Sequence, residues 1–414
     1  MKILKKIILP LVLACIMLFT LVGCVSESDV DSLKSQLEQL QAEIEDLKGS
    51  KADSDKTIEE LEAELALLKA GKSTADKSYD KLKYIDANLR DRDCRYGANF
   101  KAAQSWIKEL ALASGYDESA VATQDVTITT YVNKNVDLEE KYSAANGLST
   151  DGKYYTKSGK NYVEDPEGNY VKVEFITQNI IITKTGKSEK QIIVGAHYDG
   201  TGTGDNGSGV ALALTTAEEL ATIDTPYTIK FAFFTAEEIG GDGATAYAES
   251  LTEDEIANTL YMINLDSLTV GDYCYIYGGV QHNDTKTVTE TEAYDNAMAI
   301  SKSFGLDIRS NPWTWDNPEP GRETPKYASP STGSWSDHYD FVKIGIKYLY
   351  MEATNWEIAP YNGYGETYLA GMLMNTDNDY LEYIERFFPG RAQHHFSQFA
   401  PLLHALLVQE KVKF

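Results

Sequence analysis

Basic residues are scarce in this 414-residue chain. Lysine and arginine together number 38, against 63 aspartates and glutamates, so the formal net charge is −25. Binding to nucleic acid phosphates without regard to sequence depends on clustered Lys and Arg side chains. The composition therefore argues against a nucleic acid as a partner, and the excess of acidic groups mainly serves solubility.

Cysteine is also rare, with four residues in the chain and no CxxC pair among them. Structural zinc sites are commonly built from such pairs, so none is expected. Cys15 and Cys24 lie in the N-terminal segment, which leaves Cys94 and Cys274 for the folded part. These two residues could form one disulfide or stay as two buried free thiols, and the sequence leaves both options open.

The first 24 residues have the composition of an export signal. Three lysines precede an apolar segment that contains one proline and ends in small residues. The last four residues, LVGC at Leu21–Cys24, resemble a bacterial lipobox, which implies cleavage before Cys24 and attachment of a lipid to its thiol. We expect a signal peptide over residues 1–23, with a transmembrane anchor as the alternative. Both interpretations place the rest of the chain outside the cytoplasm, at the extracellular face of a bacterial membrane or facing a periplasm.

Residues 24–78 are predicted to form a stalk. Apolar residues recur there at alternating steps of three and four, at Val30, Leu33, Leu37, Leu40, Ile44, Leu47, Ile58, Leu61, Leu65 and Leu68. This spacing predicts a coiled coil or a helical hairpin bent near Gly49, through which the protein would associate with itself. A flexible acidic linker is the alternative, because isolated helices need partners to persist.

The composition changes at about residue 79, and residues 79–414 are predicted to form one domain. An amphipathic helix is expected from about residue 98 to 114, and a polar insertion at about residues 133–169. Farther along, apolar strands alternate with helical segments. The candidate strands are Gln191–Ala196, Thr228–Phe234, Leu260–Leu265 and Ile346–Met351. Apolar strands separated by helices imply crossover connections, so the predicted fold is α/β, with a mixed, mainly parallel central sheet flanked by helices.

Acidic residues and histidines lie next to these four strands. They are His197 and Asp199 after the first, Glu237 and Glu238 after the second, Asp266 after the third, and His338 in the turn before the fourth. In parallel sheets the functional groups collect beyond the carboxyl ends of the strands. Several carboxylates buried together are costly unless a cation neutralises them, so the pattern predicts a metal site.

The glycine-rich stretch Gly195–Gly209, GAHYDGTGTGDNGSG, resembles binding loops of several kinds, but its details exclude most of them. Three of its glycines match the dinucleotide fingerprint G-x-G-x-x-G, but they do not directly follow the strand, and Asp205 would repel a pyrophosphate. No lysine follows a glycine as in a P-loop. A calcium loop beginning at Asp199 would need a glutamate where Val210 stands. A transition-metal site therefore remains.

In combination, the segments HYDG, GDNGSG, TAEEIG, INLD and SDHYDF resemble the zinc-dependent aminopeptidases of family M28 in order and in spacing. The resemblance extends from about Asp91 to the C-terminus. It implies two zinc ions, for which manganese or cobalt could substitute. The implied roles are His197 and Asp266 on one ion, Glu238 and His338 on the other, Asp205 as the bridge, Glu237 as the general base, and Asp199 as the residue that orients the imidazole of His197.

These features predict a membrane-tethered metallo-exopeptidase, an aminopeptidase that acts on the N-terminal residues of extracellular peptides. Carboxypeptidase or glutaminyl cyclase chemistry on the same scaffold is one alternative, because a fold does not fix a reaction. A catalytically inactive surface binding lipoprotein is another. Residues Trp313–Trp335 are a candidate pocket wall or lid, with a solvated loop as the alternative. No residue that recognises a substrate amino terminus is identified.

Overall fold

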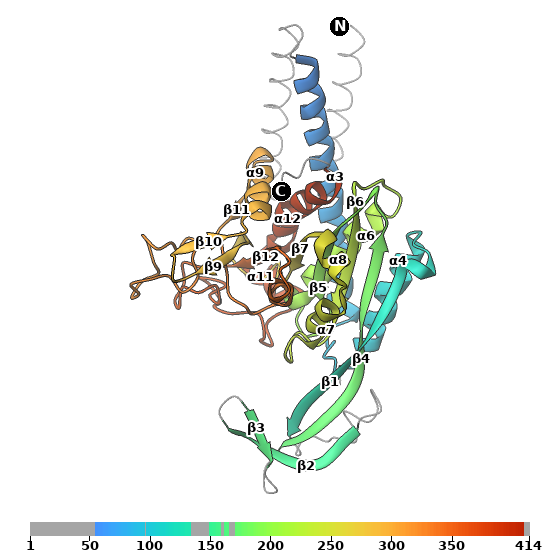
Figure 1. Ribbon diagram of the computed structural model, residues 1–414, viewed down its shortest axis with the longest axis vertical. Helices are drawn as coiled ribbons and strands as arrows, with labels where there is room; N and C mark the ends of the chain where they lie inside the picture. Colours follow the sequence, from blue (N-terminus) through green and yellow to red (C-terminus); the bar gives the residue numbers. More distant parts are fainter. Residues whose placement is uncertain (1–53, 96, 134–148, 159–160, 165–169, 410–414) are drawn as a thin grey trace.

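The computed structural model describes residues 54–95, 97–133, 149–158, 161–164 and 170–409. A ten-stranded sheet runs through the domain (Figure 1). Its strand order is β11 (Ile308–Arg309), β8 (Tyr273–Tyr277), β12 (Tyr348–Thr354), β7 (Thr259–Leu265), β5 (Ser188–His197), β6 (Tyr227–Phe234), β4 (Tyr170–Lys184), β2 (Ser149–Ser158) and β3 (Asn161–Glu164), with β1 (Val121–Asn133) paired to β4. The central strands β12, β7, β5 and β6 run parallel, which confirms the predicted fold class.

Helices cover both faces of the sheet. Successive strand residues point to opposite faces, and because the central strands are largely apolar, both faces must be buried. On β5, Ile192 and Val194 belong to the larger core, which also contains residues of α3 (Ser54–Asn88), α4 (Phe100–Ala113), α6 (Gly209–Leu220) and α12 (Arg391–Val408). Ile193 points the other way, into a second core with α7 (Asp242–Ser250) and α10 (His338–Lys343). The continuous apolar strands of the sequence are therefore buried on both sides.

The remaining elements lie at the two edges of the sheet. β1 and β4 form a long antiparallel pair, and with β2 and β3 they extend away from the body of the domain (Figure 1). β2 and β3 fall within the polar insertion predicted at about residues 133–169. Toward the other edge are β9 (Val280–His282) with β10 (Thr287–Thr289), α9 (Glu292–Ser303) and α11 (Leu381–Phe387), while α8 (Glu253–Asn258) precedes β7.

Helix α3 continues through the boundary expected at residue 78. From Gly71 onward one of its faces is buried, and the helix packs along α12 (Figure 1). A Cβ atom on Gly71 would overlap Pro401 of α12, so the glycine permits the close approach of the two helices. Ion pairs of 2.7 Å between Lys77 and Glu219 and of 2.6 Å between Lys81 and Glu218 join α3 to α6. The last part of the predicted stalk is thus an integral helix of the domain.

The signal peptide predicted over residues 1–23, the lipidation residue Cys24 and the stalk up to residue 53 lie outside the described residues. No helix in the described ranges combines the length and hydrophobicity that crossing a membrane requires. Cys94 and Cys274 are both buried and no disulfide joins them, so the structure has the second of the two options that the sequence left open, two thiols.

Candidate active site

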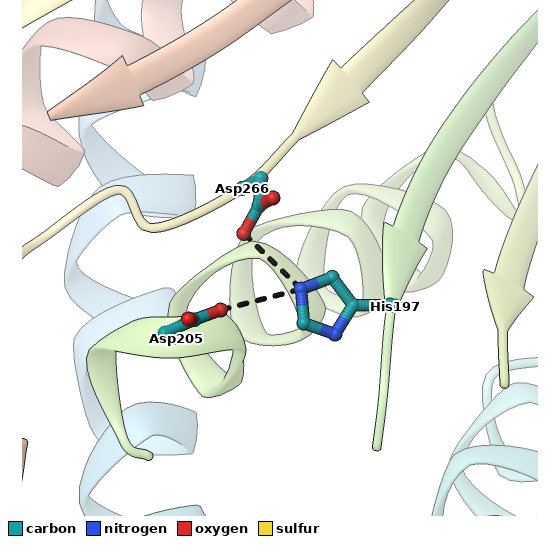
Figure 2. Close-up of side chains that lie close together, drawn as sticks. All are labelled: His197, Asp205 and Asp266. Atoms are coloured by element: carbon teal, nitrogen blue, oxygen red, sulfur yellow. Dashed lines mark hydrogen bonds and ion pairs between the residues drawn. The ribbon is translucent and has the colours of Figure 1, made fainter. Parts of the chain in front are cut away.

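Three of the predicted ligands meet at the carboxyl ends of β5 and β7. His197 is the last residue of β5, Asp266 follows β7, and Asp205 lies in a helical turn, η3 (Gly204–Ser208), that precedes α6. Atom Nε2 of His197 is 3.2 Å from Oδ1 of Asp266 and 3.3 Å from Oδ1 of Asp205 (Figure 2). The three ligand atoms lie within 4.8 Å of one another, and all three residues are buried.

This set of donors fits a divalent transition metal. One imidazole nitrogen and two carboxylate oxygens are ligands that zinc takes at catalytic sites. Burial raises the pKa of Asp205. Burial would also raise the pKa of Asp266, but His197 and a hydrogen bond from Ser336 hold it below its usual value. Burial alone would lower the pKa of His197, whereas Asp266 and Glu237 raise it well above its usual value. Burial thus opposes the ionised forms of Asp205 and Asp266, and a cation bound where the three side chains meet would stabilise them.

The turn that presents Asp205 needs its glycines and one further aspartate. A Cβ atom on Gly204 would overlap the side chain of Val270, so only glycine fits there. Asp379 accepts hydrogen bonds from the backbone N–H groups of Gly204 and Asp205, at 2.7 Å and 2.8 Å. Burial raises the pKa of Asp379 to about 7. Asp379 was not identified from the sequence, where it lies in the polar segment NTDND with no strand before it.

Arg92 holds the same loop from the side of α3. Its Nε donates a hydrogen bond to the carbonyl oxygen of Tyr198 at 3.0 Å, and its Nη2 donates to that of Gly202 at 2.7 Å. A third bond, from Nη1 to the carbonyl of Leu89 at 2.9 Å, ties the guanidinium to the end of the helix. The residue is buried. The loop that follows His197 and carries Asp205 is therefore fixed to the end of α3. No sequence motif indicates this connection.

Glu237 and Asp199 stand on either side of His197. Oε2 of Glu237 lies 4.0 Å from Nε2 of His197. Nδ1 of His197 faces Asp199, 3.3 Å from its carbonyl oxygen and 3.7 Å from Oδ1, which is the position expected of a residue that orients the imidazole. The backbone N–H of Glu237 donates to Oδ1 of Asp199 at 3.1 Å. Burial raises the pKa of Glu237 well above its usual value.

Glu238 lines the same pocket as Asp205 and Glu237. Gly200 has a φ of 112°, and a Cβ atom there would lie 2.7 Å from Oε1 of Glu238. Glycine therefore serves two needs at this position, the left-handed backbone and the space for the carboxylate. Burial, with the charge of Asp205 as the next cause, raises the pKa of Glu238 to about 8. Glu238 thus lines the pocket with Asp205, but it is not one of the three clustered residues.

The predicted ligand His338 is not brought to this pocket. It begins α10, its Nε2 is 3.1 Å from the carbonyl oxygen of Gly333, and its Nδ1 has no partner among the described residues. Its ring packs against Tyr348 and Tyr350, with centroid distances of 4.7 Å and 4.8 Å. Burial lowers its pKa to about 4. The ring thus lies outside the cluster of His197, Asp205 and Asp266, and its role as a metal ligand stays a prediction.

We expect the substitution His338→Gln to leave the metal content of the protein unchanged. The side chain is engaged with Gly333 and two tyrosines, so its loss should cost stability, about 1 kcal/mol for the ring contacts, but no ligand. Metal analysis after dialysis and thermal melting measure the two effects. His197→Gln is the matched control and should lose metal. Loss of metal from the His338 variant would restore the assignment made from the sequence.

Asn375 is a further polar residue of the pocket. Its Nδ2 is 3.4 Å from Oδ2 of Asp205, and it lines the pocket together with Glu238 and Met374. Rotation of the amide would present its oxygen, a ligand that divalent cations accept. The residue follows no strand, so the reasoning that found the other groups does not reach it.

The pocket continues from the acidic residues into an aromatic half. The aromatic part of its lining consists of Trp335, Tyr350 and Tyr364, together with Glu352 and Gly363. Trp335 comes from the segment Trp313–Trp335 that was a candidate wall or lid, and it forms part of the wall. The pocket thus combines the candidate metal ligands Asp205 and Asp266 with aromatic side chains and one further carboxyl group, that of Glu352.

The fold matches solved aminopeptidases. The zinc aminopeptidase BSAP of Bacillus subtilis aligns over 81% of this chain and 96% of its own, with a TM-score of 0.52 and 16% sequence identity. At this identity the likeness is one of fold. The model of peptidase family M28 matches residues 179–381, which contain the three clustered ligands and both glutamates. This match to the model of family M28 confirms the resemblance noted in the sequence.

Two relatives are similar to part of the chain. The alkaline phosphatase isozyme conversion protein of Escherichia coli is 33% identical over 203 residues, which are 45% of this chain and 55% of that protein. A probable lipoprotein aminopeptidase of Mycobacterium tuberculosis is 35% identical over 139 residues, which are 31% of this chain and 27% of that protein. The chain therefore spans about half, or less, of the length of these relatives.

Proposed function

We propose that the protein is a metal-dependent exopeptidase, and more narrowly an aminopeptidase that removes N-terminal residues from peptides outside the cytoplasm. The observation that carries this proposal is the meeting of His197, Asp205 and Asp266 within 4.8 Å of one another. The pocket at which they meet is also lined by Glu237. The match to a peptidase family and a relative named as an aminopeptidase support the narrower statement.

Zinc is the metal that we propose, because the donors suit it and the structurally similar enzyme is a zinc aminopeptidase. His197, Asp266 and Asp205 would hold one ion, and Asp205 with Glu238 would hold a second, with Asn375 beside them. Zinc bound at such a site supplies Lewis acidity, which lowers the pKa of water and polarises a carbonyl oxygen.

Glu237 would move the proton in the reaction. Its Oε2, near His197, would accept a proton from the attacking water and pass it to the leaving amine. A carboxyl group that performs both steps needs a pKa nearer to neutrality than that of a solvated glutamate, and burial raises the pKa of Glu237 in that direction. Asp199 supports the arrangement by holding the backbone of Glu237 and facing the imidazole of His197.

The test is a panel of amino-acid nitroanilides and dipeptides, assayed with and without a chelator. We expect release of the N-terminal residue that the chelator stops and added zinc restores. A peptide with N-terminal glutamine, followed by mass spectrometry, separates the alternatives, since cyclisation loses ammonia and hydrolysis adds water. Complete absence of chelator-sensitive release would overturn the proposal, and absence of any bound metal after dialysis would favour a binding lipoprotein instead.

We also propose that a lipid on Cys24 anchors the protein to the membrane, as the lipobox resemblance and the lipoprotein name of the mycobacterial relative suggest. The variant Cys24→Ser should move from the membrane fraction to the soluble fraction, as followed by immunoblotting. Cys94→Ser, which alters a buried thiol, is the control and should stay with the membrane. A Cys24 variant that remains in the membrane would indicate a transmembrane anchor. Self-association through the segment before α3 stays a prediction.

A further inference from the structure

The aromatic half of the pocket contains one buried carboxyl group that the proposed reaction does not use. Glu352 lies on β12 with 3% of its surface exposed, and it lines the pocket. The hydroxyl of Tyr277 donates to its Oε2 at 3.0 Å, and that of Tyr350 donates to its Oε1 at 3.2 Å. The indole Nε1 of Trp356 in turn donates to the hydroxyl of Tyr277 at 2.7 Å. The carboxyl group is thus held in a fixed position by a chain of aromatic residues.

The protein supplies no positive charge to Glu352. In the part of the chain that the structure describes, no lysine, arginine or histidine forms an ion pair with it, and the charged groups that act on it, Asp266 and Glu366, are acidic. Burial therefore raises its pKa to about 8. A buried carboxylate without a cation is unfavourable. Its position in the wall of a pocket indicates that the missing cation is one that a ligand brings.

The walls around Glu352 suit a long cationic side chain. Trp335 and Tyr364 pack together with a centroid distance of 5.3 Å, and Tyr350 also lines the pocket. Aromatic faces attract ammonium and guanidinium groups. They also pack well against the methylene stems of lysine and arginine, whose charged ends reach beyond the apolar part. An apolar residue would leave the carboxyl group buried and unpaired.

We infer that Glu352 makes this pocket select substrates whose N-terminal residue is lysine or arginine, by pairing its carboxylate with the side-chain cation. The inference rests on the proposed function and names its substrate class. The side chain is the favoured source of the charge, because the α-amino group is only two bonds from the carbonyl that is attacked. Asp266 is the charged group that acts most strongly on Glu352, so the α-amino group is the alternative source of the charge, and the tests below separate the two.

The first test compares the zinc-loaded protein with its Glu352→Gln variant on the nitroanilides of arginine, lysine, leucine and methionine. We expect kcat/KM for arginine and lysine to exceed that for leucine by about tenfold or more, and the variant to lose about 100-fold on the two cationic substrates, mainly through KM. Hydrolysis of the leucine substrate should change by less than about threefold. Glutamine keeps the volume of the side chain and an oxygen that accepts from a tyrosine.

A matched control is Glu366→Gln. Glu366 is also a fully buried carboxyl group, but it binds the backbone N–H groups of Leu373 and Met374 and does not line the pocket. This variant should alter stability without changing the ratio of arginine to leucine hydrolysis. An equal loss on arginine and leucine in the Glu352 variant would mean that Glu352 reads the α-amino group or only supports the fold. That result, or a parent protein without preference for cationic residues, would overturn the inference.

A second test does not depend on turnover. In a Glu237→Gln background, calorimetry measures the affinity for L-argininamide and for L-norleucinamide, which lacks the side-chain charge. Argininamide should bind more tightly than norleucinamide. Adding Glu352→Gln should lower the affinity for argininamide about 100-fold. If no peptide is hydrolysed but this loss occurs, the inference stands and the proposed reaction fails. If leucine substrates are hydrolysed but neither test discriminates charge, the reaction stands and the inference fails.

Discussion

Replacing Glu237 with glutamine should reduce kcat for peptide hydrolysis by about 10³-fold or more while the metal content of the protein stays unchanged. The side chain lies 4.0 Å from His197 at the edge of the metal-binding cluster, so it can act on a proton there without belonging to the clustered ligands. Glutamine has nearly the same shape, but its amide does not accept a proton near neutral pH. Nitroanilide kinetics and metal analysis on the same preparation measure the two quantities.

The neighbouring glutamate provides the control. Glu238 lies beside Asp205 in the pocket, and Glu238→Gln should lower the amount of metal that survives dialysis. The two variants carry the same chemical change at neighbouring positions. A general disturbance of the loop would therefore affect both alike. If the Glu237 variant lost metal and the Glu238 variant kept it, the roles of the two residues would be reversed.

Removing the metal should lower the melting temperature by on the order of 10 °C at pH 8 and by much less at pH 5. Burial raises the pKa of Glu238 and that of Glu352 to about 8, and that of Asp379 to about 7. A carboxyl group whose pKa is higher in the folded protein stabilises the fold below its unfolded pKa, near 4, and that stabilisation is lost as pH rises through the folded pKa. The free energy of unfolding of the metal-free protein should therefore fall between about pH 5 and pH 8.

Adding zinc should remove most of this dependence on pH. A cation at the cluster favours the ionised forms of Asp205 and Glu238, so their ionisation no longer opposes folding. Glu352 and Glu366 lie outside the cluster, and their contribution should persist in the loaded protein. Melting curves at several pH values, with chelator and with zinc, give the comparison. Metal-free protein that melts higher at pH 8 than at pH 5 would contradict the assignment of these buried carboxyl groups.

Much of the site follows from one regularity of the sequence, the acidic or histidine residue after each apolar strand. That regularity predicted His197, Asp199, Glu237, Glu238 and Asp266 at one edge of the sheet, and the structure has them there. Glu352 carries a related signal, because it is the one charged residue of β12, within the segment YLYMEAT. It was not predicted, since it lies inside the strand and the rule considers only residues beyond a strand end.

The other groups could not be predicted in this way. Asn375 and Asp379 lie in irregular chain after β12, and Arg92 lies between α3 and α4. Periodicity fixes which face of a strand is buried, but it does not fix the path of a loop, which depends on contacts with distant segments. The sequence also does not give the orientation of His338, whose ring packs against Tyr348 and Tyr350 at the start of α10.

The attachment of α3 determines how the domain can move relative to whatever precedes it in the chain. Its second half is built into the core, and Arg92 fixes the chain just after it to the loop that carries His197 and Asp205. A hinge between helix and catalytic loop is therefore absent in this described part of the molecule. A force or a rotation applied at the N-terminal end of α3 would pass to the mouth of the pocket as a rigid-body turn, so the orientation of the pocket follows the axis of a single helix.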